Sequence, residues 1–236
     1  SLDRINYSND TVTAVVKGSL SVARSYLAAT GNADFGYFGG GSPPNKSTVD
    51  RIDYTNDTAT ASAKGPLSVA RNALHATGNA DFGYFGGGGP SSTVDRIDYS
   101  NDTATASAKG PLSSARSQLG ATGNQDFGYF GGGHPGVSTV DRIDYSSDTG
   151  TTPTKGPLSA ARRLLEATGN ADFGYFGGGF PGPKSTVDRI DYSNDTATAV
   201  VKGPLSVARF NLTATGNADF GYFGGGRAPS LSLIHI

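Results

Sequence analysis

The chain has 236 residues, of which 36% are hydrophobic, 35 are Gly and 12 are Pro, so it can build a core but is too rich in Gly and Pro for a protein of long helices. The absence of Cys, Met and Trp excludes disulfides, thiolate metal sites and cysteine nucleophiles. With 19 basic and 20 acidic residues, the net charge of −1 lacks the basic footprint of a nucleic-acid-binding protein, and no apolar run approaches the ~20 residues of a membrane span.

A repeat of 45 to 47 residues organises the whole chain. Asp-Arg-Ile begins at Asp3, Asp50, Asp95, Asp141 and Asp188, and Phe-Gly-Tyr-Phe-Gly-Gly-Gly recurs in step with it. A period of this length admits either four short strands or two to three helices. The local residue pattern therefore has to decide between these architectures.

Each unit has the pattern of four short strands, as the second unit shows. In chain order we expect strand c at 48–54, strand d near 59–64, strand a around 71–76 and strand b at 82–85. Strands b and c combine aromatic and β-branched residues with Gly, Asn and Asp at their borders. Between Pro66 and Gly78 there is room only for a short strand, so a helix is not expected there.

A single four-stranded sheet cannot cover both of its faces, and radial packing into a propeller covers them. We therefore predict an all-β fold, a five-bladed β-propeller of four-stranded antiparallel blades that forms one domain over residues 1–229. The chain starts with a c strand and finishes after a b strand, so the first and last half-repeats are expected to complete one composite blade. A fragment of a longer array is the alternative. Residues 230–236 look like the translation of a sequencing adapter and are expected to lie outside the fold.

The units resemble Kelch repeats. The resemblance rests on the Gly-Gly after strand b, the Tyr of strand c and the Ala-Arg before strand a, and it extends to about Gly226. The Trp usual in Kelch repeats is missing from every unit, so the blades are similar to divergent members of that family. The resemblance implies a propeller that serves as an interaction platform. The near-identical copies are also similar to repeat arrays of environmental and phage origin.

Most charged and aromatic residues recur at the same position in every unit, as Asp81, Arg71 and Phe82 do. We interpret them as scaffold, with turn-capping Asp and Asn, Arg–Asp pairs and aromatic packing between blades. The three histidines share no repeat position, and the Asp-rich turns lack the ligand spacing of an EF-hand loop. We therefore expect no catalytic residue, no metal site and no cofactor.

The copies differ at two groups of positions, one around the invariant Leu of strand a and one after the triple Gly of strand b. In a four-stranded meander the d–a and b–c connections emerge on the same face, which we call the diversified face. Neutral drift at exposed positions is the alternative explanation of the variation. The candidate ligand-binding residues are Tyr26, Ala28, Ala73, His75, Gln118, His134, Arg163, Leu164, Glu166, Phe180, Phe210, Asn211 and Arg227.

These residues include all three aromatic residues outside the scaffold, Tyr26, Phe180 and Phe210, which are expected to form one aromatic sector. We predict a non-enzymatic recognition or adhesion module that binds a glycan or a protein, with no nucleic-acid partner and no membrane span, as a monomeric ring or part of a longer chain. One alternative is a glycan-acting propeller enzyme, although Glu166 lacks a second carboxylate. Another is a structural repeat of a larger surface or virion assembly. The compartment stays open, with an extracellular or virion-surface location favoured.

Overall fold

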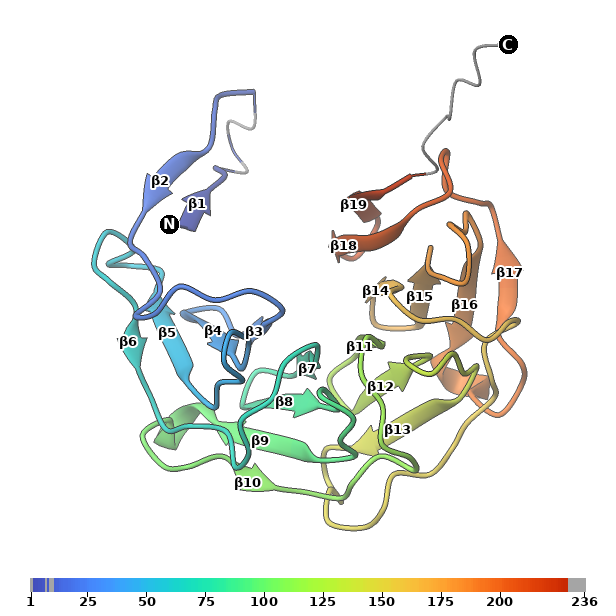
Figure 1. The fold of residues 1–236 in the computed structure, drawn as a ribbon, viewed down its shortest axis with the longest axis horizontal. Coiled ribbons are helices and arrows are strands. Elements are labelled where there is room, and N and C mark those ends of the chain that lie inside the picture. Colours follow the sequence, from blue (N-terminus) through green and yellow to red (C-terminus); the bar gives the residue numbers. More distant parts are fainter. Residues whose placement is uncertain (1, 7, 9–10, 229–236) are drawn as a thin grey trace.

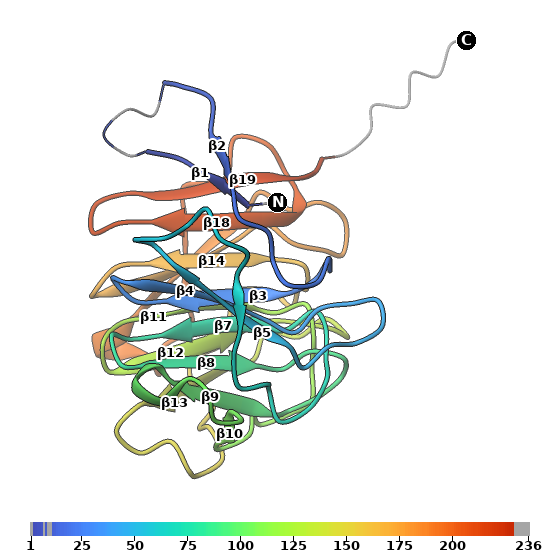
Figure 2. The same cartoon turned by 90° about the vertical axis from the view of Figure 1, so that its left-hand side faces the viewer.

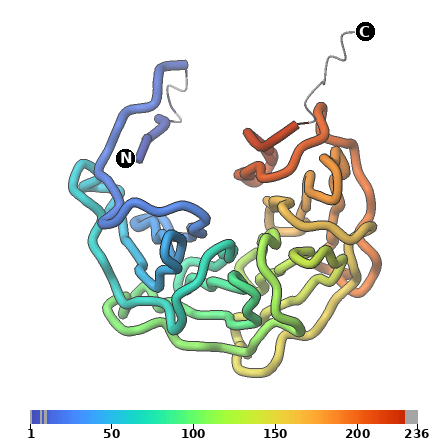
Figure 3. Tube along the Cα trace, in the orientation of Figure 1, coloured from blue at the N-terminus to red at the C-terminus, as the bar shows by residue number. Residues whose placement is uncertain are grey.

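The computed structural model describes residues 2–6, 8 and 11–228. Antiparallel sheets stand side by side along an arc, each with one strand on the inner side, as in a propeller whose ring has a gap (Figure 1, Figure 3). The inner strands of successive blades are neighbours (Figure 2). The described part of the chain contains no helix long and apolar enough to cross a membrane. The tail predicted at 230–236 lies outside the described residues.

Four blades form most of the arc, and a two-stranded sheet lies at each end of it. The first two blades are β3 (Ala28–Gly31), β4 (Phe35–Gly39), β5 (Val49–Asp53) and β6 (Ser62–Ala63), then β7 (His75–Gly78), β8 (Phe82–Gly86), β9 (Val94–Asp98) and β10 (Ser107–Ala108). The next two are β11 (Gly120–Gly123), β12 (Phe127–Gly131) and β13 (Val140–Asp144), then β14 (Glu166–Gly169), β15 (Phe173–Gly177), β16 (Val187–Asp191) and β17 (Val200–Lys202). The end sheets are β1 (Leu2–Arg4) with β2 (Val15–Lys17), and β18 (Phe210–Gly216) with β19 (Gly221–Arg227). Short 3-10 turns, η1 (Tyr99–Asn101) and η2 (Tyr192–Asn194), follow β9 and β16.

Within each blade the strands form an antiparallel meander. In the second blade Phe82 faces Asp98 and Gly86 faces Val94, and the other blades repeat this register. The third blade has three strands, because its fourth is reduced to a single bridge between Asp141 and Thr154. Pro153 lies next to that bridge and has no N–H to donate, which limits further pairing.

Strands b and c agree with the prediction, whereas strands a and d are shorter than expected. Strand a of the second unit is β7 (His75–Gly78) rather than 71–76, and strand d is β6 (Ser62–Ala63) rather than 59–64. The cause for strand a is Ala73, whose φ of 52° interrupts the extended backbone. The preceding Arg71 is a core residue, because its side chain is buried within the blade.

The predicted composite blade is not formed in this structure. Strands β1–β2 and β18–β19 are separate sheets at the two ends of the arc, and no pairing between them occurs among the described residues (Figure 1). Each end sheet therefore keeps only its own two strands among the described residues.

A buried ion pair stabilises the interior of each complete blade. In the second blade Arg71 Nη1 lies 2.7 Å from Asp95 Oδ2, and the two side chains are 2% and 0% exposed. Arg71 Nη2 also donates to the carbonyl oxygen of Phe85 at 2.9 Å, and the Ser68 N–H donates to Asp95 Oδ2 at 3.1 Å. The equivalent pairs are Arg24–Asp50, Arg116–Asp141 and Arg162–Asp188. These side chains are scaffold, as the sequence predicted.

Each of the first three blades binds one aspartate of the following blade. Between the second and third blades, Tyr84 donates to Asp148 Oδ2 at 2.9 Å, and Arg96 and Lys109 lie 2.8 and 3.2 Å from the same carboxylate. The ring of Tyr84 stacks on Tyr145 with the centroids 4.7 Å apart. The same contacts join the first blade to the second and the third to the fourth. The scaffold therefore repeats from one blade to the next.

Candidate functional site

The two groups of variable positions meet on one face. Backbone bridges pair Ser117 with His134 and Arg163 with Phe180, so the segment before strand a lies against the loop after strand b. The Arg163 and Phe180 amides donate to each other's carbonyl oxygens at 2.9 and 2.8 Å. The diversified face is therefore a continuous band rather than a set of isolated loops.

The inner edge of the diversified face is a ring of residues with left-handed backbone. One residue of each repeat has a φ between 52° and 57°, namely Tyr26, Ala73, Gln118, Leu164 and Asn211. The N–H of Ala73 donates to the carbonyl oxygen of Tyr26 at 2.9 Å, and the three later residues continue this ladder at 2.8 to 3.0 Å. Because the contact is made by backbone atoms, each side chain is free to differ.

We expect Ala73→Gly to raise the free energy of unfolding by about 0.5–1 kcal/mol. Left-handed backbone costs an L-residue roughly 1–2 kcal/mol, which exceeds the ~0.4–1 kcal/mol that the extra freedom of Gly gives the unfolded chain. Urea-induced unfolding measures the change. Ala121→Gly in the extended strand β11 is the matched control, and there a loss of roughly 0.5–1 kcal/mol is expected. Losses of similar size at both positions would show that Ala73 is not strained.

A pocket of about 90 Å³ lies at the mouth of the channel, where the inner strands converge. Its walls combine invariant leucines of strand a with variable residues contributed by five repeats. The predicted ligand-binding residues that line it are Tyr26, Ala73, His75, Gln118, Leu164, Glu166 and Asn211. We call this the channel pocket.

Within the channel pocket His75 and Glu166 meet across an intervening blade. His75 Nδ1 lies 3.3 Å from Glu166 Oε1, although β7 and β14 belong to the second and fourth blades. Strand β11 of the third blade lies between them and has Gly120 at the equivalent position, where an added Cβ would come within 3.3 Å of the Glu166 carbonyl carbon. Glu166 Oε1 also accepts from the Ala167 N–H at 3.0 Å. Burial raises the pKa of the Glu166 carboxyl above its usual value, although His75 and the Ala167 N–H act in the opposite direction.

A second cluster, which we call the rim cluster, lies on the neighbouring loops. Arg163 Nη1 is 2.7 Å from His134 Nδ1, and the Arg163 guanidinium lies 5.2 Å from the centre of the Phe180 ring. Phe180 packs edge to face on Phe210 with the centroids 5.6 Å apart, and Arg227 faces Phe210 in the β18–β19 register. A guanidinium beside two half-buried rings can stack on the apolar face of a sugar or on a planar side chain.

The other predicted residues differ in their surroundings. Ala28 is buried in the core together with Leu74 and Tyr37, and it does not line the channel pocket. Tyr26 is 65% exposed, and within the described part of the chain its ring makes no contact with Phe180 or Phe210. Sequence reasoning missed Gly120 as the residue that lets His75 and Glu166 approach, and the signal was a Gly at the repeat position of these two side chains.

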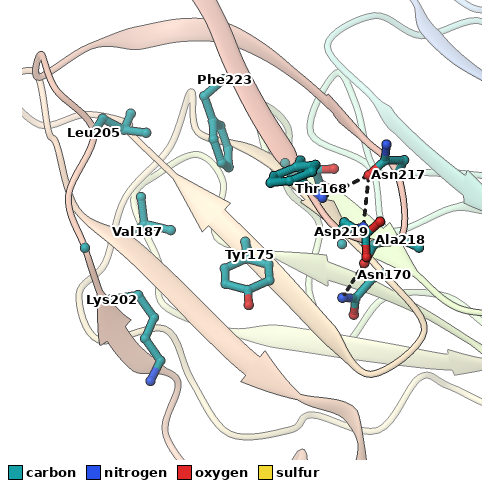
Figure 4. A pocket seen from close by; sticks show the side chains of 14 residues that line it. Thr168, Asn170, Tyr175, Val187, Lys202, Leu205, Asn217, Ala218, Asp219 and Phe223 are labelled. Carbon is teal, nitrogen blue, oxygen red and sulfur yellow. Dashed lines mark hydrogen bonds between the residues drawn. The ribbon is translucent and has the colours of Figure 1, made fainter.

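A larger pocket, of about 310 Å³, lies between the fourth blade and β18–β19. Tyr175 and Lys202 line one side of it, and Asp219 and Phe223 line the other (Figure 4). In the second blade the equivalents of Tyr175 and Lys202 are Tyr84 and Lys109, which bind Asp148 of the next blade. This pocket therefore lies where one blade contacts the next, and it is not part of the diversified face.

No protein family and no curated protein sequence matches the chain. The arrangement of its sheets is similar to the solved structure described as "Structure of YjhT", with a TM-score of 0.72 at 13% sequence identity, over 88% of this chain and 78% of that one. The chain folds as a β-propeller. At this identity the similarity shows the fold alone, so the function of the propeller has to be argued from its own residues.

Proposed function

We propose that the protein is a non-enzymatic recognition module that binds a glycan or a protein through its diversified face. The main support is that variable side chains of five repeats converge on the channel pocket, while the scaffold contacts around them are repeated. The rim cluster adds aromatic and guanidinium groups, which are frequent anchors of binding surfaces. A rigid frame that presents varied side chains is suited to recognition.

A glycan-acting enzyme is the second candidate, and the His75–Glu166 pair is the observation in its favour. Most glycosidases use two carboxyl groups about 5–9.5 Å apart, placed on opposite sides of the scissile bond. Here one carboxylate lies 3.3 Å from an imidazole in a pocket of about 90 Å³. This arrangement leaves no room for a scissile bond between the two groups, so binding is the better supported function.

The proposal predicts that a double variant, Tyr26→Ala with Phe210→Ala, loses capture of a ligand found by screening glycan arrays and displayed protein libraries. Loss of aromatic anchors typically costs at least about 2 kcal/mol of binding free energy, which corresponds to a roughly thirtyfold higher dissociation constant. Biolayer interferometry measures the change, and circular dichroism checks the fold.

The control is Val200→Ala on the outer strand β17, which removes exposed apolar surface away from the diversified face. This variant is expected to bind like the unmodified protein. Unchanged capture by the folded double variant would place the ligand elsewhere and would contradict the proposed site.

We also propose that the units are Kelch-like blades and that the half-repeats close the ring as a fifth, composite blade. The two ends are complementary in their charges. Arg209 is the repeat equivalent of Arg71, and Asp3 is the equivalent of its buried partner Asp95. In the open arc Arg209 donates instead to the carbonyl oxygen of Gly225 at 3.0 Å. Closure would complete a fifth buried Arg–Asp pair.

The contact surfaces at the two ends support the same closure. Tyr222 is the equivalent of Tyr84, yet it is 62% exposed whereas Tyr84 is fully buried. Tyr175 and Lys202 surround the pocket into which the aspartate of a following blade would fit. Asp10, which lies outside the described residues, is the sequence equivalent of that aspartate. The first half-repeat thus carries the residue that the fourth blade is shaped to hold.

A further inference from the structure

We propose that the channel pocket binds a primary ammonium group, carried by a lysine side chain of a protein partner. The inference rests on the proposed recognition function and narrows its ligand from a glycan or a protein to a protein. It is carried by the polar atoms, the size and the walls of the pocket.

Two acceptor groups of the pocket, the Gln118 amide oxygen and the Glu166 carboxylate, receive few hydrogen bonds. Gln118 Oε1 is buried and accepts no hydrogen bond from the described residues. The Glu166 carboxylate receives one N–H, from Ala167, and its distance of 3.3 Å from His75 Nδ1 is long for a charge-assisted hydrogen bond. Neither Lys nor Arg is among the residues that line the pocket. A primary ammonium supplies one positive charge and three donors, which matches this set.

The size and the walls of the pocket favour the end of a side chain over a sugar ring. Its volume of about 90 Å³ is well below the roughly 300–1,000 Å³ of typical small-molecule sites. Leu74, Leu165 and Leu212 line it together with the polar groups. Lysine buries its methylene stem along apolar surface while its ammonium head finds polar partners, so these walls suit a lysine.

The same residues do not suit a metal ion. Structural and catalytic zinc sites use at least three His, Cys or acidic ligands. The described residues contain no group of three such side chains, and the pocket is lined by one imidazole, one carboxylate and the amide groups of Gln118 and Asn211. Arg163 does not compete for Glu166, because its guanidinium lies over Phe180 and outside the pocket.

The test is an NMR titration of the ¹⁵N-labelled protein with Nα-acetyl-lysine methylamide. We expect saturable shifts of the amide signals of Gln118, Glu166 and Ala167. The same compound acetylated on its side-chain nitrogen lacks the charge and should produce none. Glu166→Gln keeps the shape of the side chain, and Gln118→Gly removes the amide oxygen at a position where Gly fits the positive φ of 57°. Loss of a charged hydrogen bond should weaken binding in Glu166→Gln by about tenfold or more.

Asp81→Asn removes a carboxylate from an exposed turn outside the channel pocket, so it is the control and should titrate like the unmodified protein. Equal shifts with the acetylated compound, unchanged binding in both pocket variants, or response to zinc chloride but not to the amine would each overturn the proposal. These outcomes leave the recognition function separately testable, because the Tyr26/Phe210 double variant is scored on capture of its own screened ligand.

Discussion

Asp95→Ala is expected to lower the free energy of unfolding by about 3–5 kcal/mol. Asp95 is fully buried and accepts hydrogen bonds from Arg71 at 2.7 Å and from the Ser68 N–H at 3.1 Å. The substitution leaves the Arg71 guanidinium in the core without a counter-charge, and desolvation of an unpaired charge is the main cost. Urea-induced unfolding followed by circular dichroism measures it.

Asp81→Ala is the matched control, because Asp81 also recurs in every repeat but lies exposed in the a–b turn. Within the described chain its carboxylate has no hydrogen-bond or ion-pair partner, so a change within about 0.5 kcal/mol is expected. If Asp95→Ala costs no more than Asp81→Ala, the buried pairs are not part of what holds the blades together.

Gly110→Ala is expected to be almost as damaging, at about 3 kcal/mol or more. A Cβ at Gly110 would lie 1.6 Å from the carbonyl oxygen of Gly150, a backbone atom of the next blade. Neither group is the flexible end of a side chain, so the second and third blades would have to separate. Gly18, Gly65 and Gly156 make the same approach, which explains why Gly recurs at this position.

Gly203 is the fifth copy of this Gly, and its surroundings differ between an open arc and a closed ring. In the open arc no atom lies within 4 Å of a Cβ placed there, so alanine would be tolerated. In a closed ring Gly203 would meet the backbone near Val12, the sequence equivalent of Gly150. The proposed composite blade therefore predicts that Gly203→Ala loses stability comparable to Gly110→Ala in the same urea experiment. A neutral Gly203→Ala beside a damaging Gly110→Ala would contradict closure.

The repeat made much of the fold predictable. Strands b and c contain Phe, Tyr, Val and Ile between Gly and Asp borders, and the structure places them where this pattern indicates. Strand a was placed too early because Ala73 gives no sign of its left-handed backbone. The five residues at this position are Tyr, Ala, Gln, Leu and Asn, and only Asn commonly adopts a positive φ. The hydrogen-bond ladder between blades that fixes this conformation is a tertiary contact and leaves no local sequence pattern.

The candidate site was predictable in its place but not in its chemistry. Variation among the copies pointed to the channel mouth, where the structure brings together residues of five repeats. The partner of Glu166 could not be predicted, because His75 lies 91 positions earlier and the two side chains meet only through the packing of successive blades. The turn capping expected of Asp and Asn is made in the a–b turn by Asn79, whose Oδ1 accepts from the Asp81 and Phe82 amides at 2.9 Å.

Hydrogen exchange with and without a screened ligand tests the central claim most directly. Binding through the diversified face predicts slower exchange in the segments around 71–75, 116–120 and 163–166 and in the loops 134–137 and 180–184. The turns around 79–81, 124–126 and 170–172 on the opposite face should be unchanged. Protection confined to those invariant turns, with the diversified face exchanging as in the free protein, would contradict the proposed recognition surface.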